Sequence, residues 1–335
     1  MSSSSLQLAP DRSAPETPAA LARRPIHGPG RRRVRRRGFL FDGLMVLPAL
    51  LIVAVFGLYP MFDTIRLSFL DYDIFRVNFA GTPFVGFDNY VAILTDPEFL
   101  QTALNTATFG VVVTVAIVGL GLGVAPVLNR KLFGTGLLRG VALMPWFVPG
   151  IVASAIWLWI FSPGQSPINQ VLMELGWIDA PIRFLGETGT WGPFSIPLIA
   201  IAIARVWGGL PLAITLLLAG LQSIDNAVYD SAKVDGANRW QTFVHITLPL
   251  LRPTIFILTA LLLIGTVGHF ELVYLMTGGG PANLTNVLAV YSYHEAFVNG
   301  QYGLAAAASS IILVVSAIIG AVYMVLDRRT RESNS

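Results

Sequence analysis

The sequence predicts an all-α membrane protein with six transmembrane helices, and three observations support that prediction. Of its 335 residues, 54% are hydrophobic and only 12% are charged, whereas soluble domains carry about a quarter charged residues. The mean hydropathy is +0.66. The apolar residues also form runs long enough to cross the roughly 30 Å of hydrocarbon in a bilayer as helices.

Several of these spans contain helix-breaking residues. Pro145 and Pro149 fall in the third span and Pro211 falls in the fourth, so both helices are predicted to kink or break. Broken helices at membrane depth occur where protein or a water-filled cavity supplies hydrogen-bond partners to the freed backbone groups. A solute path is one such place, and ordinary kinking is the alternative. Gly119 and Gly123 in the second span have the spacing that allows close helix approach. The six predicted spans are residues 39–60, 106–128, 138–161, 195–220, 253–276 and 303–326.

Basic residues set the orientation of the spans. They gather after spans two, four and six, whereas the segment 277–302 has none and the other opposite-side loops contain only Arg76 and Arg183 well inside them. The positive-inside rule therefore predicts that both termini are cytoplasmic, as an even number of spans requires. The basic residues on the predicted cytoplasmic side are Arg130, Lys131, Arg139, Lys233, Arg239, Arg252, Arg328, Arg329 and Arg331.

Three regions follow from this pattern. Residues 1–38 are predicted to be a disordered, Arg-rich cytoplasmic tail, 39–327 the six-helix domain with a cytoplasmic loop at 221–252, and 328–335 a second cytoplasmic tail. The arginines that end the first region could also bind nucleic acid or anionic lipid. We favour the tail, with membrane lipid and no nucleic acid as a partner, because the run directly precedes an apolar span.

The cytoplasmic loop between spans four and five reads as two short helices around a turn. The pair Asp235-Gly236 predicts a turn, because glycine takes a positive φ without a steric clash. Asp225 is a predicted N-cap for the first helix, and Pro249 is predicted to end the second. Such a polar helix pair suits docking to a soluble partner, and the alternative is an amphipathic connector packed beneath the bundle. Four apolar residues of the second helix share one stripe at helical spacing: Trp240, Phe243, Val244 and Leu248.

This loop resembles the conserved cytoplasmic loop of ABC importer permeases, whose pattern is Glu-Ala-Ala, three residues, Gly, nine residues, Ile, one residue and Leu-Pro. Here Asp-Ser-Ala replaces Glu-Ala-Ala, and the spacing fits at every step. The resemblance implies a type I importer permease fold and a loop that seats in a cleft of the ATPase subunit. The residues to which it assigns this coupling role are Asp230, Ser231, Ala232, Asp235, Gly236, Ala237, Ile246, Leu248 and Pro249.

Motifs outside the loop are similar to those of carbohydrate-importer permeases of the maltose and glycerol-phosphate type. They are Tyr59-Pro60, Ser68-Phe69, the run Phe84 to Tyr90, Asn105-Thr106, Thr277 to Pro281, Thr285, Tyr293 and Phe297. The resemblance implies a multi-pass permease of the bacterial inner membrane in an ATP-driven sugar importer. It also implies three partners: a second, similar permease, a dimeric ATP-binding subunit and an extracytoplasmic sugar-binding protein or lipoprotein.

Enzyme chemistry is not predicted for this chain. It has no phosphate-binding Gly-x-x-x-x-Gly-Lys-Ser/Thr motif, and its only lysines are Lys131 and Lys233. ATP and Mg²⁺ are therefore expected in the partner ATPase, with no cofactor in this chain. It has no cysteine, and its four histidines lack metal-ligand spacing, so neither a metal site nor catalytic residues are predicted.

A few polar and aromatic residues fall inside predicted spans. A charge at the centre of a span costs roughly 2.5–3.5 kcal/mol on insertion scales, so such residues usually face a partner or a wet cavity. They are predicted to line the substrate path, and an interhelical ion pair or a contact with the partner permease is the alternative. An ion-gradient-driven secondary transporter would need intramembrane carboxylates and an inverted repeat. Only Glu271 lies well inside a predicted span, with Asp63 near an end, and the sequence shows no convincing repeat. The candidate path residues are Arg205, Trp207, His269, Glu271 and Tyr274.

Overall fold

The computed structural model describes residues 36–130, 134–191 and 194–332. The chain divides into two units, residues 1–56 and 57–335. The regular secondary structure of their described residues is helical apart from one short hairpin and two isolated β-bridges. In the hairpin, β1 (Thr190–Trp191) pairs antiparallel with β2 (Phe194–Ser195). Most of the predicted N-terminal tail, Lys131 and residues 333–335 lie outside the described residues.

The first unit contains helix α1 (Arg36–Val53), which begins three residues before the predicted span. A π-helical turn, η1 (Ala54–Leu58), follows it across the unit boundary. Apolar side chains of α1 such as Leu47 and Leu51 are exposed, as expected for a helix that faces lipid.

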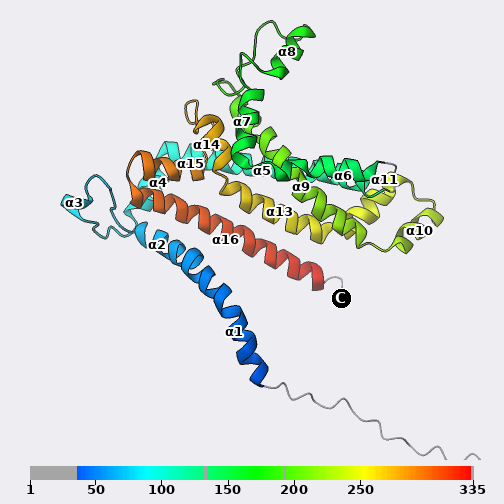
Figure 1. Ribbon diagram of the computed structural model, residues 1–335, viewed down its shortest axis with the longest axis horizontal. Coiled ribbons are helices and arrows are strands. Elements are labelled where there is room, and N and C mark those ends of the chain that lie inside the picture. Colours follow the sequence, from blue (N-terminus) through cyan, green and yellow to red (C-terminus); the bar gives the residue numbers. More distant parts are fainter. Residues whose placement is uncertain (1–35, 131–133, 192–193, 333–335) are drawn as a thin grey trace, which may run out of the picture. The chain divides into compact units, whose positions relative to one another are not determined.

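The second unit contains long helices joined by short helical segments (Figure 1). Ahead of α9, its helices are α2 (Tyr59–Leu67), α3 (Val77–Ala80), α4 (Asp88–Thr95), α5 (Pro97–Leu128), α6 (Thr135–Leu143), the 3-10 turn η2 (Met144–Phe147), α7 (Gly150–Ile160) and α8 (Pro167–Glu174). From α9 onward they are α9 (Ile196–Gln222), α10 (Asn226–Val234), α11 (Arg239–Thr242), the π-helix η3 (Phe243–Thr247), α12 (Leu248–Leu250), α13 (Arg252–Val267), α14 (Glu271–Thr277), α15 (Leu288–Tyr293), the π-helix η4 (His294–Val298) and α16 (Tyr302–Glu332).

The core of this unit lies where α5, α9 and α13 pack together. Helices α5 and α9 approach closely at Gly121, where an added Cβ would lie 3.0 Å from Ala213 and Leu217 side-chain atoms. The spacing of Gly119 and Gly123 pointed to the wrong face of the helix, because nothing lies within 4 Å of a Cβ at either position. Small residues allow close packing only where they face the neighbouring helix.

Four helical segments are long and apolar enough to cross a membrane, and two bent helix pairs raise the number to six if each pair is one span. The second span begins at Pro97 rather than at 106, because the Asp96 carboxylate accepts a hydrogen bond from the Glu98 N–H at 3.0 Å and caps the helix. The predicted break in span three is present, since α6–η2 and α7 meet at an angle of 100°. Span four is one continuous helix that contains Pro211.

The fifth span differs most from its prediction over 253–276. Helix α13 ends at Val267, and α14 begins separately at Glu271. At its other end, the segment Arg239–Leu250 meets α13 at 66°. Pro249 lies inside the short helix before this bend, so the helix continues to Leu250 instead of ending at the proline.

Candidate functional site: a buried cavity and an exposed loop

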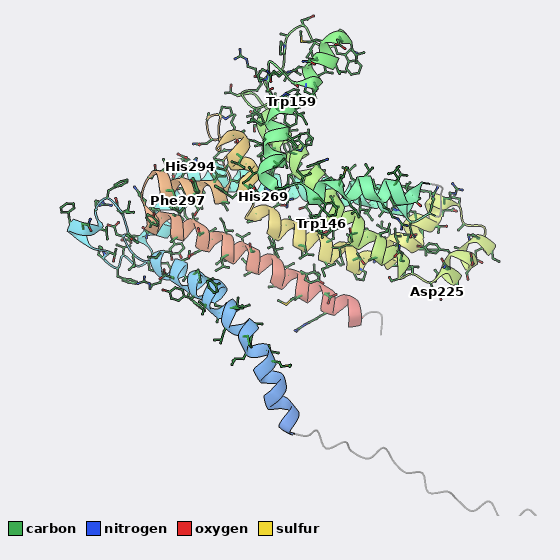
Figure 2. All side chains as sticks on the ribbon, in the orientation of Figure 1. Trp146, Trp159, Asp225, His269, His294 and Phe297 are labelled. Atoms are coloured by element: carbon green, nitrogen blue, oxygen red, sulfur yellow. The ribbon has the colours of Figure 1, made fainter. Side chains whose placement is uncertain are left out.

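Four of the five candidate path residues line one cavity of about 170 Å³. Arg205 and Trp207 enter it from α9, while His269 and Glu271 enter it from the break between α13 and α14. The cavity is completed by residues around the break in span three, among them Pro145, Trp146, Gly150 and Ala153. Figure 2 shows Trp146 and His269 in the same central region of the unit.

Both helix breaks are needed to form this cavity. The chain is extended at Pro149 and α7 begins at Gly150, against which α14 packs. A Cβ at Gly150 would collide with the Glu271 carboxyl group, so only glycine leaves room for that side chain. Trp207 is held from the α7 side, where its ring lies edge-on to Trp157 at 6.0 Å. The cavity therefore depends on the irregular backbone that Pro149 introduces.

Arg205 has no ionic partner among the described residues. None of the ion pairs formed there includes it, and its Nε is buried without a hydrogen-bond acceptor. The guanidinium passes between two glycines, with Nη1 3.7 Å from a Cβ built on Gly209 and Nη2 3.9 Å from one built on Gly265. The alternative of an interhelical ion pair is thus not realised at Arg205 within the described chain.

Tyr274 does not line this cavity. It belongs to an aromatic cluster in which its ring centroid lies 4.8 Å from both Phe270 and Tyr293. Tyr293 continues the cluster to Phe297 at 5.0 Å, and these rings, except Tyr274, border a second cavity of about 370 Å³. Tyr274 lies three residues beyond Glu271 on the same helix, α14, but its ring packs in the aromatic cluster instead of the cavity.

The loop between α9 and α13 has the predicted turn at Asp235-Gly236. The Asp225 carboxylate accepts a hydrogen bond from the Ala227 N–H at 3.0 Å and caps α10, as predicted. At the other end of α10, Gly236 has φ +77°. Its N–H donates to the Lys233 carbonyl at 3.1 Å, and the Ala237 N–H donates to the Ala232 carbonyl at 2.9 Å. These two bonds form a Schellman cap, which needs a left-handed residue at the glycine position.

The second half of the loop begins with a reciprocal cap. The Asn238 side chain and the Gln241 side chain each accept a backbone N–H of the other residue at 2.9 Å. The helix then widens into the π-helical segment η3. Of the predicted stripe, Phe243, Val244 and Leu248 are partly buried, whereas Trp240 is 72% exposed, with its ring centroid 6.1 Å from that of Phe243.

The motif residues of the loop divide into an inner and an outer set. Ala232 is buried, and Ala237, Ile246, Leu248 and Pro249 are partly buried. The outer residues are Asp230, Ser231, Asp235 and Gly236, all of them exposed, with Asp230 in an ion pair to Lys233 at 2.8 Å.

Two exposed apolar side chains, Val234 and Trp240, stand beside the turn. Val234 is 88% exposed, and sequence reasoning did not single it out. Its position next to the Asp-Gly turn was the available signal. Figure 2 shows the start of this loop, at Asp225, at the end of α9 and away from His269.

Comparison with known proteins shows which family the chain belongs to. Residues 117–332, which include the cavity and the loop, match the model of the inner membrane component of binding-protein-dependent transport systems. The chain belongs to this family. It is therefore a multi-pass inner-membrane transport component.

Relatives in this transport family align over most of the chain. The trehalose/maltose transport system permease protein MalF of Thermococcus litoralis is 35% identical over 86% of this chain and 94% of its own length. The multiple sugar-binding transport system permease protein MsmF of Streptococcus mutans is 31% identical over 85% and 94%. These relatives are not secondary transporters, so the ion-gradient alternative is not supported.

A solved structure shows the same fold. A chain of a bacterial alginate ABC transporter, in complex with an alginate pentasaccharide-bound periplasmic protein, superposes with a TM-score of 0.72 and 24% sequence identity, covering 88% of this chain and 96% of that one. The predicted importer-permease fold is confirmed by this likeness.

Hydrogen bonds join two segments that are far apart in the sequence. The Asn105 side-chain amide of α5 donates hydrogen bonds to the carbonyls of Asn283 at 2.9 Å and Asn286 at 3.0 Å. Thr106 accepts the Leu288 N–H at 2.9 Å. Asn105-Thr106 and residues 283–288, more than 170 residues apart in the sequence, therefore form one structural joint between α5 and the segment that leads into α15.

Proposed function

We propose that this chain, a permease subunit of a sugar ABC importer, forms half of a translocation path and is driven by a separate ATPase through the loop around Gly236. The observation that carries the proposal is the exposed turn of that loop, with Gly236 at φ +77° and Val234 and Trp240 on its surface. Exposed apolar side chains grouped at one turn are typical of a docking surface.

The proposed topology has six spans with both termini in the cytoplasm. Two bent pairs added to four long helices support six crossings. The distribution of basic residues supports the orientation, because the coupling loop carries Lys233, Arg239 and Arg252 while segment 277–302 carries none.

The ATPase is proposed to supply the chemistry that this chain lacks. ATP and Mg²⁺ would bind in that dimeric subunit. When it closes, the capped helix α10 would move as a rigid unit, because its Asp225 cap and its Schellman cap fix both ends. The motion would reach the spans through Leu251, which is buried where the loop enters α13.

The solute path is proposed to pass the cavity of Arg205, Trp207, His269 and Glu271. Six spans enclose little space, so a second, similar permease would complete the path, and an extracytoplasmic sugar-binding protein would deliver the solute. The names of the relatives support a carbohydrate: they include trehalose and maltose, sulfoquinovosyl glycerol and glycerol 3-phosphate systems.

Affinity purification of the tagged chain from its native membrane tests this assembly. We expect an ATP-binding subunit, a second six-span permease and a sugar-binding protein to co-purify with the wild-type chain. A Val234→Asp variant should retain the second permease and lose the ATPase, because an unpaired charge would be buried at the contact. Recovery of the chain alone, or an ATPase that stays bound to the variant, would contradict the proposal.

A further inference from the structure

The cavity contains a positive charge that no described residue compensates. Its lining includes two formally charged side chains, Arg205 and Glu271, and they form no ion pair with each other. Arg205 lies on α9, nine residues beyond its first residue, within a segment long and apolar enough to span the membrane. A guanidinium at this depth is costly unless a partner or water meets it.

Glu271 has a different source of compensation. Its carboxyl group lies directly against Gly150, the first residue of α7. The first backbone N–H groups of a helix have no intrahelical acceptor, and the helix dipole adds partial positive charge at that end. The carboxyl group therefore lies where the partial positive charge of α7 favours a carboxylate, and it forms no ion pair with Arg205.

The cavity is also lined by two aromatic side chains, Trp207 and Trp146. Trp207 lines it from α9 and Trp146 lines it from η2, where Trp146 is 59% exposed. Indole faces suit the apolar faces of sugar rings, and a guanidinium forms paired hydrogen bonds with carboxylate, sulfonate or phosphate oxygens. An acidic sugar presents both of these chemical features.

We infer that the cavity around Arg205 is selective for the anionic group of an acidic sugar, such as a uronate. This inference rests on the proposed function, because it takes the cavity to be part of the solute path. The acid group would lie in the cavity against the Arg205 guanidinium, which has no ionic partner among the described residues, and the ring would lie toward Trp207 and Trp146.

The absence of cysteine from the chain allows a direct test of this charge. In the assembled transporter, Ala153→Cys places a unique thiol of this chain on the cavity lining. Its reaction rate would be measured with two methanethiosulfonate reagents, one bearing a sulfonate and one bearing a trimethylammonium group. Gln165→Cys, at an exposed position outside the cavity lining, corrects for the intrinsic rates of the two reagents.

We expect the corrected rate ratio to favour the sulfonate reagent by about tenfold, from one uncompensated charge in a partly desolvated cavity. Arg205→Gln should abolish the preference, and Arg205→Lys should retain it. Arg183→Gln, an exposed arginine outside the cavity lining, should leave it unchanged. An unchanged yield of the purified complex in each background reports that the variant chain is folded and assembled.

The outcomes separate the two proposals. A cavity that reacts with both reagents without a sulfonate preference, or whose preference survives Arg205→Gln, overturns the anionic inference and leaves the solute path standing. A cavity thiol that reacts with neither reagent, while Gln165→Cys reacts, overturns the solute path and this inference together.

Discussion

A carboxylate at position 236 should uncouple the transporter without unfolding it. Gly236 has φ +77°, and nothing lies within 4 Å of a Cβ built there. An alanine at this position would therefore meet no steric clash and would cost roughly 1–2 kcal/mol for the left-handed backbone, which a folded domain tolerates. An aspartate adds a charge that the docked ATPase would bury, at a further cost of about 3 kcal/mol or roughly 100-fold in affinity.

The assay is the ATPase activity of the purified complex with loaded binding protein, together with the amount of ATPase that stays bound to the tagged chain. Gly236→Ala should keep most of both, and Gly236→Asp should lose both. Gly134→Asp is the matched control, because Gly134 has φ +83° and equally open surroundings but lies outside the loop. Full stimulated activity in the Gly236→Asp complex would refute the coupling role.

Three further predictions concern other parts of the chain. Val234→Ser should weaken binding of the isolated ATPase roughly tenfold, from the loss of about 1.5 kcal/mol of apolar burial. Val228→Ser on the same helix, at a position 39% exposed, should change the affinity little. Equal affinities of the two variants, measured by biolayer interferometry, would argue against a docking surface at Val234. Asn105→Ala should destabilise the complex by about 1–3 kcal/mol because two carbonyls lose their donor. Gln170→Ala, at an exposed amide, should change the melting temperature little, and an unchanged melting temperature of the Asn105→Ala complex would contradict the joint. Burial and the nearby Glu98 and Asp96 carboxylates raise the pKa of Glu295. The folded chain therefore binds the Glu295 carboxyl proton more tightly than the unfolded chain does, and stability should fall as the pH rises above the ordinary pKa of Glu. Glu295→Gln should reduce that fall between pH 5 and pH 8, and an identical pH profile of the variant would exclude this contribution.

The local features of the loop could be predicted from the sequence because each depends on a few neighbouring residues. The Asp225 cap and the turn at Gly236 follow from residue chemistry alone. The π-helix at 243–247 and the exposure of Trp240, which lies just before it, do not. A widened turn changes the helical period on which the predicted apolar stripe was based.

The path residues show where long-range packing decides the outcome. In the apolar run 253–276, Gly268 directly follows Val267, but a single glycine does not distinguish a break from a continuous helix. At the break, Glu271 packs against Gly150 and Phe270 stacks on Tyr274 at 4.8 Å. Four of the five residues are therefore brought together as predicted, and Tyr274 is not.

Reconstituted uptake tests the central claim most directly. The purified complex would be placed in liposomes with its binding protein outside, and uptake would be measured for the sugar that most stabilises that binding protein. The account predicts uptake that requires ATP on the ATPase side and no ion gradient, and that Gly236→Asp abolishes. Uptake driven by an ion gradient without ATP, or unaffected by Gly236→Asp, would contradict it.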